Sequence, residues 1–516
     1  MRHNKFSDEA RQQIKKGMEV MYNAVRITLG PRGRNVVIQD TKPVITNDGV
    51  TVAKSVKTDD AVESIGTELL KEVAEKTNDQ AGDGTTTAVV LAYAMIEEGI
   101  KNVVAGSDPM SIKRGIDKAT IQAIELLNTI KKPVKDEAEQ VAIIAAEDIE
   151  MGKMIAGVIK EVGENGVVTV EESQTFGISK ELTKGMQIDN GFISRFMVTD
   201  IERNEAIYRD IPVLITDQKI FANSDIVPLL QKMDEKSQRN LFVIAEDISG
   251  EALGTMFLSK AQGGFNVLGI KASSYGARKK DVLEDIALLT GAKFISEESG
   301  IKLDKVGLDV LGKADKVVSN DKKTLIIGNG DVSERIKLIK SQLKEATEDW
   351  MKNSLKDRLA KLTDGVAIIR VGAATEAEMK YKKFKIEDAL NATRAAIEEG
   401  IVPGGGIALV KVSSMMDFKD LTDDERVGAN IVKKALISPL RQIAENSGMK
   451  DISVIVNDVQ NDKGFDFNKN ESVDMMEAGI IDPLKVTRCA LQNASSMAGI
   501  FLTMEAAICW DGDKSK

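Results

Sequence analysis

Histidine and cysteine are nearly absent from this chain of 516 residues, and their absence excludes several kinds of chemistry. The single histidine, His3, stands near the start of the chain, so histidine-based acid–base catalysis and zinc sites with histidine ligands have almost no support. Two cysteines, Cys489 and Cys509, are too few for a disulfide framework and indicate a reducing compartment. Any chemistry must therefore rest on carboxylates, hydroxyls, lysines and backbone amides.

Long apolar runs and an excess of basic charge are missing as well. No stretch of about 18 consecutive apolar residues occurs, so the sequence predicts no membrane span and no membrane partner. Residues Met1–Lys5 lead into polar sequence rather than the apolar core of a secretory leader, so we expect a cytoplasmic protein, or an organelle-matrix protein if a presequence was removed. The net charge of -10 gives no electrostatic support for binding nucleic acid.

The composition that remains is that of a globular protein with several domains. Apolar residues make up 42% and charged residues 29%, enough for a sizeable core, and at about 150 residues per domain the length indicates roughly three domains. Apolar residues recur every three or four positions in three segments of the first quarter, which predicts three amphipathic helices, the first capped by Ser7 and the third starting at Pro109. Their apolar faces are Ile14, Met18, Met21 and Val25; Val62, Ile65, Leu69 and Val73; and Ile112, Ile116, Ile124 and Leu127.

The middle of the chain has a different pattern. Short apolar runs lie about 25 to 30 residues apart, with helical or turn-rich sequence between them, which predicts βαβ units and a parallel sheet. A charged, helix-rich segment over Glu334–Leu362 follows, and the end of the chain returns to helices and glycine turns. The apolar runs are Ile211–Thr216, Leu241–Ala245, Phe265–Ile270 and Phe294–Ile295.

The sharpest motif is Ala81–Thr87, with two glycines, an aspartate and three consecutive threonines before the apolar run Ala88–Leu91. Glycines let the backbone approach a ligand closely, and a helix starting at the threonines would aim free N–H groups and hydroxyls at an anion. Asp83 could hold Mg²⁺ against the same phosphates. A capped helix start with a glycine turn explains the segment equally well, so both interpretations stay open. An ordinary P-loop is excluded, because the chain has no G-x-x-x-x-G-K-[ST].

Other glycine and carboxylate motifs are better explained singly by local structure. Gly30–Asn35 favours a turn, and Asn47-Asp48-Gly49 predicts a hairpin with Asp48 as a turn residue. Asp388 is expected to be a solvated helix residue, and Asp482, before Pro483, a cap or turn residue. Their functional value depends on whether they meet in space.

Adjacent apolar residues gather in the middle region and allow two interpretations. Adjacent apolar residues on a helix cannot all face one narrow side, so some could form an exposed apolar patch that binds other molecules. Core packing is the simpler explanation for each one. The segments are Phe192-Ile193, Phe196-Met197, Ile226-Val227, Leu229-Leu230, Leu253 and Met256–Leu258.

Taken together, these motifs resemble the group I chaperonin family, the bacterial and organellar 60-kilodalton chaperonins. The matching segments follow the family's order: Thr28–Asn35, Thr46–Val50, Ala81–Thr87, Asp388–Ala396, Gly404–Gly406 and Asp482–Arg488. The resemblance implies a multidomain α+β fold with three domains. These are a helical equatorial ATPase domain (residues 1–129 and 399–516), a small α/β intermediate hinge domain (130–183 and 367–398) and an α/β apical domain inserted between them (184–366).

The resemblance also implies a function and partners. It predicts an ATP hydrolase that forms heptameric rings, one or two, binds non-native polypeptides and encloses them under a co-chaperonin lid, with ATP, Mg²⁺ and K⁺ as cofactors. A ring-forming holdase or scaffold without productive ATP cycling is the alternative. Retention of Asp48, Asp83 and Asp388 favours the first hypothesis, because a passive binder does not need all three. A metabolic phosphotransferase finds no supporting feature.

The resemblance assigns site residues as follows. Asp388 and Asp48 position or activate the attacking water, Asp83 binds Mg²⁺, and the Thr28 carbonyl lies near K⁺. The nucleotide-binding residues are Thr28, Leu29, Gly30, Pro31, Asp83, Gly84, Thr85, Thr86, Thr87, Gly405, Asn468, Ile480 and Asp482. The polypeptide-binding residues are Phe192, Phe196, Met197, Val227, Leu230, Leu253, Phe257 and Leu258.

Two departures from the family's pattern bear on assembly. Asn190 stands where the family commonly has an arginine that pairs between subunits with the position of Glu376, so we expect altered cooperativity. Lys450 stands where double-ring members have a carboxylate facing the position of Arg441, and like charges there would repel, which is compatible with a single ring.

Overall fold

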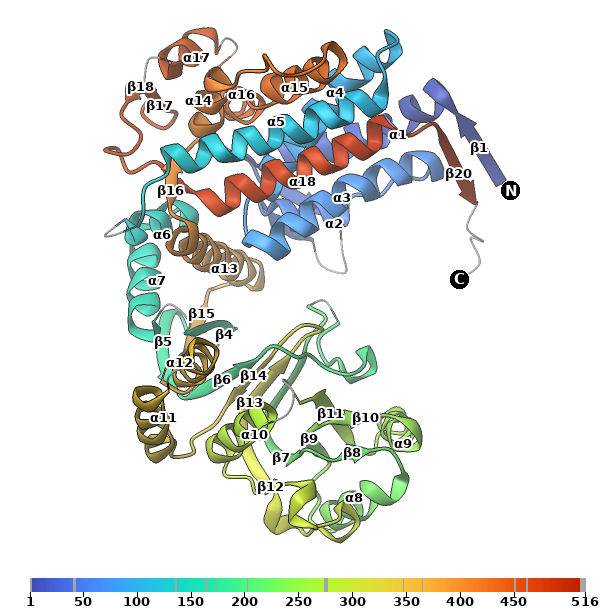
Figure 1. The fold of residues 1–516 in the computed structure, drawn as a ribbon, viewed down its shortest axis with the longest axis vertical. Helices are drawn as coiled ribbons and strands as arrows, with labels where there is room; N and C mark the ends of the chain where they lie inside the picture. The colour runs from blue at the N-terminus through green and yellow to red at the C-terminus, as the bar shows by residue number, and fades with distance from the viewer. Residues whose placement is uncertain are drawn as a thin grey trace. The chain divides into compact units, whose positions relative to one another are not determined.

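The computed structural model divides into two compact units, each assembled from separate stretches of the chain (Figure 1). The first comprises Met1–Gly157, Glu172–Gly177 and Val371–Lys516, and the second Val158–Glu171 and Ile178–Arg370. The structure describes residues 2–39, 43–134, 137–163, 166–173, 175–201, 203–272, 277–346, 348–363, 365–449, 452–460 and 463–510. In these ranges no helix is both long and apolar enough to cross a membrane.

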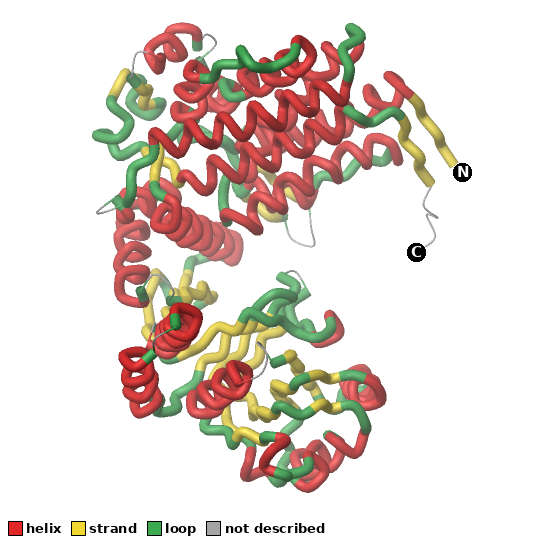
Figure 2. The backbone as a smooth tube through the Cα atoms, in the orientation of Figure 1, coloured by secondary structure: helices red, strands yellow, loops and turns green. Residues whose placement is uncertain are grey.

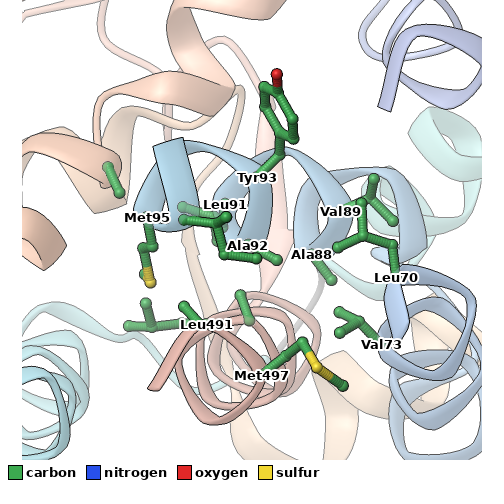
Figure 3. Packing of buried hydrophobic residues seen from close by; sticks show 14 of the residues in the cluster. Leu70, Val73, Ala88, Val89, Leu91, Ala92, Tyr93, Met95, Leu491 and Met497 are labelled. Carbon is green, nitrogen blue, oxygen red and sulfur yellow. The ribbon is translucent and has the colours of Figure 1, made fainter. Parts of the chain in front are cut away.

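The first unit is mainly helical (Figure 2). Its core surrounds α4, whose residues from Ala88 to Met95 are almost all buried and pack against α3 and α18 (Figure 3). Close packing there depends on apolar faces contributed by both ends of the chain. The helices are α1 (Ser7–Arg26), α2 (Gly49–Ser55), α3 (Ala61–Ala81), α4 (Thr85–Val104), α5 (Pro109–Ile130), α6 (Ala138–Ala146), α7 (Ile149–Val162, which continues into the second unit's range), α13 (Glu376–Glu399), α14 (Ile407–Met415), α15 (Asp423–Ala435), α16 (Ser438–Asn446), α17 (Ser453–Gln460) and α18 (Leu484–Leu502).

Short antiparallel strand pairs lie in the first unit. The pairs are β1 (Arg2–Phe6) with β20 (Ala506–Trp510), β2 (Val36–Ile38) with β3 (Val44–Thr46), β16 (Ile401–Pro403) with β19 (Ile481–Pro483), and β17 (Gly464–Asp466) with β18 (Glu471–Val473). The pairs β1 with β20 and β16 with β19 join distant segments, and β2 with β3 and β17 with β18 join segments close in sequence. In the third pair Val402 faces Asp482, so the glycine loop after Pro403 is brought beside that carboxylate.

The second unit contains a seven-stranded sheet of order β11-β9-β7-β13-β14-β6, with β12 beside β7. The strands β7, β9, β11 and β12 are parallel, as the sequence predicts, while β13, β14 and β6 continue the sheet in antiparallel fashion. Their bounds are β6 (Gly185–Ile188), β7 (Ala206–Thr216), β9 (Asn240–Ala245), β11 (Asn266–Lys271), β12 (Phe294–Ile295), β13 (Gly312–Ser319) and β14 (Thr324–Ile327).

Helices and smaller sheets complete the second unit. The helices are α8 (Val227–Asp234), α9 (Gly250–Ala261), α10 (Ala277–Thr290), α11 (Ser333–Glu345) and α12 (Asp349–Thr363), and β8 (Lys219–Ile220) pairs with β10 (Asp247–Ile248). A further sheet has the order β4 (Val167–Glu172), β15 (Val366–Gly372), β5 (Gly177–Thr183). The helical unit and the α/β unit together confirm the predicted multidomain α+β class.

Three local predictions can be compared with these elements. The three N-terminal helices are confirmed, and the charged segment Glu334–Leu362 forms most of the two helices α11 and α12. Ser7 as a helix cap is wrong: Phe6 holds the cap position of α1, and Ser7 is the first helical residue, whose Oγ donates to Glu505 Oε1 at 2.6 Å. Pairing of β1 with β20 places Glu505, next to β20, within reach of that hydroxyl.

Candidate functional site

One cavity of about 730 Å³ in the first unit collects the glycine and carboxylate motifs of the sequence. Its volume lies within the range of small-molecule sites, roughly 300–1,000 Å³. Every nucleotide-binding and catalytic residue that the resemblance assigns lines this cavity: Thr28, Leu29, Gly30, Pro31, Asp48, Asp83, Gly84, Thr85, Thr86, Thr87, Asp388, Gly405, Asn468, Ile480 and Asp482. The carboxylates that sequence spacing alone explains as local features therefore meet in space.

The turn between α3 and α4 forms one wall of the cavity. Gly82 ends α3 with φ 71° and Gly84 precedes α4 with φ 82°, left-handed conformations that glycine adopts without steric cost. The first backbone bond of α4 runs from Ala88 N–H to the Gly84 carbonyl. The N–H groups of Thr85, Thr86 and Thr87 precede that bond and have no acceptor inside the helix, so they are available to an anion in the cavity.

Asp48 begins a helix, so the predicted hairpin at Asn47-Asp48-Gly49 is wrong. The Asp48 carboxylate accepts from the N–H groups of Val50 at 3.2 Å and Thr51 at 3.0 Å, which caps α2. An antiparallel strand pair, β2 with β3, lies just upstream instead. A side-chain acceptor that satisfies the first free N–H groups of a helix outweighs the strand propensity of the valines and threonine that follow.

Two close contacts join the segments around the cavity. A Cβ atom at Gly49 would lie 2.3 Å from Thr86 Oγ1 and 2.5 Å from Thr85 Oγ1, so only glycine fits between α2 and α4. Thr28 Oγ1 donates to the Val25 carbonyl at 2.8 Å and lies 3.1 Å from Thr86 Oγ1. The loop after α1 and the start of α4 are thus held within hydrogen-bonding distance of each other.

Carboxylate side chains line much of the cavity: Asp48, Asp83, Glu147, Asp148, Asp388, Asp466 and Asp482. Burial raises the pKa of Asp388 well above its usual range, and Asp48 and Asp83 raise it further, against the opposing effect of Lys385. Burial also raises the pKa of Asp83 and, with a contribution from Asp83, that of Asp482 to about 7. A cation bound among these groups would favour their ionised forms.

The donor set fits a magnesium ion that is shared with phosphates. Among the residues that the structure describes, no group of three or more histidines, cysteines or carboxylates is arranged to hold a metal by itself. Mg²⁺ usually takes one or two protein carboxylates and completes its coordination with water and phosphate oxygens. Asp83 beside the free N–H groups of α4 provides that combination.

Lys385 and Glu147 also line the cavity, and the sequence analysis missed both. Lys385 Nζ lies 2.7 Å from Glu147 Oε1, and the ammonium is the cation that opposes the charge of Asp388 and Asp83. Lys385 stands three residues before Asp388 on α13, which places both on one helix face. The three-residue spacing from Asp388 could have predicted that Lys385 lies near the same site. Glu147 follows α6 in a left-handed conformation, with φ 55°. Nothing in the local sequence predicts that conformation or a place in the cavity.

The predicted polypeptide-binding residues of the second unit are exposed to very different degrees. Phe196 is 73% and Leu258 64% exposed, and the Phe196 and Phe257 rings lie 5.2 Å apart at a 43° angle. We call Phe196, Phe257 and Leu258 the apolar patch; it combines the short 3₁₀ helix Arg195–Met197 with α9. Val227, Leu253 and Phe257 are half-buried. Phe221, which the sequence analysis did not single out, is 60% exposed.

Three of the predicted polypeptide-binding residues are buried in this structure. Phe192, Met197 and Leu230 are 8%, 1% and 6% exposed and belong to the core of the second unit. Phe192 bridges to Ile270 of β11, and the Met197 Sδ accepts from the Gly269 N–H at 3.2 Å. All three side chains pack inside the buried apolar clusters of the second unit.

The structure shows contacts for Asn190 and Glu376, two of the positions that the resemblance links to assembly. Asn190 Nδ2 donates to the Lys271 carbonyl at 2.9 Å, so its side chain is tied to β11 of its own unit. Glu376 lies 3.9 Å from Lys380 on α13. Lys450 lies outside the described residues.

Comparison with known proteins gives a family and a fold. A family model described as the TCP-1/cpn60 chaperonin family matches residues 21–510. Crystal form II of the chaperonin gp146 from the bacteriophage EL 2 (Pseudomonas aeruginosa), in the presence of ATP-BeFx, is similar with a TM-score of 0.70 at 20% sequence identity, covering 99% of each chain. Crystal form I of that protein gives a TM-score of 0.64 at 20% identity, covering 98% of this chain and 99% of that one. At such identity the likeness shows a shared fold.

Proposed function

Because this chain belongs to the TCP-1/cpn60 chaperonin family, we propose that it is a group I protein-folding chaperonin that hydrolyses ATP. One observation carries the proposal: glycine loops, a threonine-rich helix start and the carboxylates of Asp48, Asp83, Asp388 and Asp482, from distant parts of the sequence, line a single cavity. The gp146 chaperonin was crystallised in the presence of ATP-BeFx, an observation about that protein that agrees with a nucleotide in this cavity.

In this proposal the start of α4 binds the triphosphate. The N–H groups and hydroxyls of Thr85, Thr86 and Thr87 donate to phosphate oxygens, and the positive end of the helix dipole favours their charge. Asp83 would hold Mg²⁺, and the Thr28 carbonyl would contribute to a K⁺ site. The base and ribose lie toward the other wall, formed by Gly405, Asn468, Ile480 and Asp482.

Two carboxylates act on the attacking water in different ways. Both oxygens of Asp48 already accept hydrogen bonds from α2, donated by the Val50 N–H, the Thr51 N–H and the Thr51 hydroxyl, so Asp48 is held rigidly and orients the water. Asp388 stands on α13, and its raised pKa suits a group that accepts a proton from that water during the reaction. Mg²⁺, when bound, neutralises charge on the transferred phosphoryl group.

The apolar patch is proposed to bind non-native polypeptides. Burial of apolar area is non-directional, so one patch can bind many unrelated unfolded chains. The exposed side chains of Phe196 and Leu258, with the Phe257 ring packed against Phe196, supply that surface. We further propose the three-domain partition given above, a ring of seven subunits, and a co-chaperonin lid that competes for the same surface.

A holdase that captures unfolded chains without an ATP cycle is the second candidate. The apolar patch alone would serve it, and no nucleotide would be needed for capture. The holdase does not explain why Asp48, Asp83 and Asp388 line one cavity, where they are proposed to orient the water, bind Mg²⁺ and accept a proton, respectively. The first proposal accounts for all three.

Native mass spectrometry of the purified protein, with and without Mg²⁺ and ATP, tests the assembly. We expect seven or fourteen subunits, with ATP changing the collision cross-section of the ring because nucleotide binding and domain closure are coupled. A monomer under both conditions would contradict an encapsulating ring. The number of rings also reports on the charge at Lys450, since repulsion there disfavours a second ring.

A further inference from the structure

Asn446, the last residue of α16, contacts the nucleotide loop Ile27–Gly33 from outside the cavity. Its side-chain Nδ2 donates to the Arg26 carbonyl at 2.9 Å and to the Leu29 carbonyl at 2.8 Å. Carbonyl oxygens can only accept, so the amide nitrogen of Asn446 must face them. The Arg26 carbonyl also accepts from the Leu29 N–H at 3.3 Å, so the Asn446 side chain adds a second hydrogen bond there and ties the end of α1 to the residue that follows Thr28.

Gln442, one turn earlier on α16, orients that amide. Gln442 Nε2 donates to Asn446 Oδ1 at 2.9 Å, and Gln442 Oε1 accepts from the Tyr22 hydroxyl at 3.1 Å. Gln442 is 3% exposed, so water does not compete for these bonds. Because each group has a donor or acceptor of the right kind, the chain Tyr22–Gln442–Asn446 has one stable orientation, with the Asn446 donor toward the loop.

The loop that Asn446 holds is part of the cavity, although Asn446 itself does not line it. Thr28, Leu29 and Gly30 line the cavity, and Thr28 Oγ1 lies 3.1 Å from Thr86 Oγ1 at the start of α4. The loop is closed by hydrogen bonds from Gly33 N–H to the Gly30 carbonyl at 2.9 Å and from Arg34 N–H to the Ile27 carbonyl at 2.8 Å. A shift of the Leu29 carbonyl would therefore move Thr28 away from the phosphate-facing threonines.

We propose that Asn446 is a positioning residue for nucleotide binding, acting through the two carbonyls of the loop and oriented by Gln442; this inference rests on the proposed function. The carboxylates assigned to the chemical step, Asp48 and Asp388, belong to α2 and α13 and make no contact with Asn446 that the structure records among its described residues. Loss of the Asn446 donor should therefore weaken nucleotide binding and leave the chemical step intact.

The test is Asn446→Asp, which keeps the size of the side chain and removes the N–H donors. We expect the KM for ATP and the Kd for ADP measured by calorimetry to rise roughly tenfold, with kcat within about twofold of the parent, because two hydrogen bonds to the loop are lost. Hydrogen exchange of the nucleotide-free protein should become faster at the amides of Gly33 and Arg34. Gln442→Leu should change the same quantities in the same direction by a smaller factor.

Asn128→Asp is the matched control. Asn128 Nδ2 also donates to a backbone carbonyl, that of Ile124 at 2.9 Å, but on α5 and away from the cavity lining. We expect parental KM, Kd and exchange in this variant. Parental KM, Kd and exchange in Asn446→Asp, or a lower kcat with unchanged KM, would overturn the proposal. If the parent neither binds nor hydrolyses nucleotide, the proposed function fails, while the exchange rates still report whether Asn446 holds the loop.

Discussion

Asp388→Ala is expected to bind ATP with near-parental affinity and to hydrolyse it about 10²- to 10⁴-fold more slowly, the usual contribution of a general base. The side chain removed lies beside Asp48 and Asp83 in the cavity, where burial and these two neighbours raise its pKa. The change leaves Thr85, Thr86 and Thr87 of α4 and the loop after α1 untouched. Single-turnover hydrolysis and equilibrium binding of ATP, measured on the same preparation, separate the two effects.

Glu387→Ala supplies the control for that variant. Glu387 precedes Asp388 on α13 and does not line the cavity, so its loss removes one carboxylate from the helix without removing one from the site. We expect near-parental turnover in the control. Near-parental turnover in Asp388→Ala as well would assign the chemical step to another group, with Asp48 the next candidate.

The double substitution Phe196→Ser with Leu258→Ser is expected to abolish capture of an unfolded protein and leave ATP turnover close to the parental rate. Both side chains are largely exposed, so the change removes apolar surface without opening a cavity in the core. Leu230→Ser should act differently, because Leu230 is 6% exposed within the core of the second unit. Its replacement is expected to destabilise that unit by about 2–5 kcal/mol, seen as a lower melting temperature.

Capture is measured as suppression of aggregation of a chemically unfolded monomeric enzyme diluted into the chaperonin. Leu338→Ser is the control, since Leu338 is 47% exposed on α11, which contributes nothing to the apolar patch. Unchanged capture by the double variant, with capture lost in Leu338→Ser, would place the binding surface elsewhere on the second unit.

The helix start after Asp83 was predictable from the sequence because the signals there are local. The glycines flanking Asp83 and the threonines after it specify a helix start with free N–H groups, and the structure places α4 there, beginning at Thr85. The parallel strands of the second unit were likewise predicted, because a strand buried on both faces is a short run of apolar residues. Such a run can be recognised without knowing which strands lie beside it.

The spacing of residues along the chain could not predict that Asp482 and Asp388 line the same cavity. The pairing of β16 with β19 sets Val402 opposite Asp482, and α13 brings Asp388 to the same cavity, contacts between segments that no local pattern encodes. Resemblance to a family supplied these residues instead. The capping of α2 by Asp48 was missed because a turn signal and a helix cap use the same residue types, and only the position of the next free N–H groups distinguishes them.

Exposure was the least predictable property. Phe196 and Met197 are adjacent in sequence, yet one is 73% and the other 1% exposed, because the short helix Arg195–Met197 turns one outward and the other toward Gly269. Both side chains are apolar, so the sequence could not predict which of the two is exposed. Asn446 gave no signal at all, since its role depends on which carbonyls α16 approaches.

The most direct test of the central claim is recovery of native activity by an unfolded monomeric enzyme bound to this protein, with ATP or without nucleotide, in the parent and in Asp388→Ala. The proposed chaperonin predicts capture in every case and ATP-dependent recovery in the parent, with repeated rounds of recovery lost in Asp388→Ala. Capture followed by the same low recovery with and without ATP in the parent would contradict it and support the holdase.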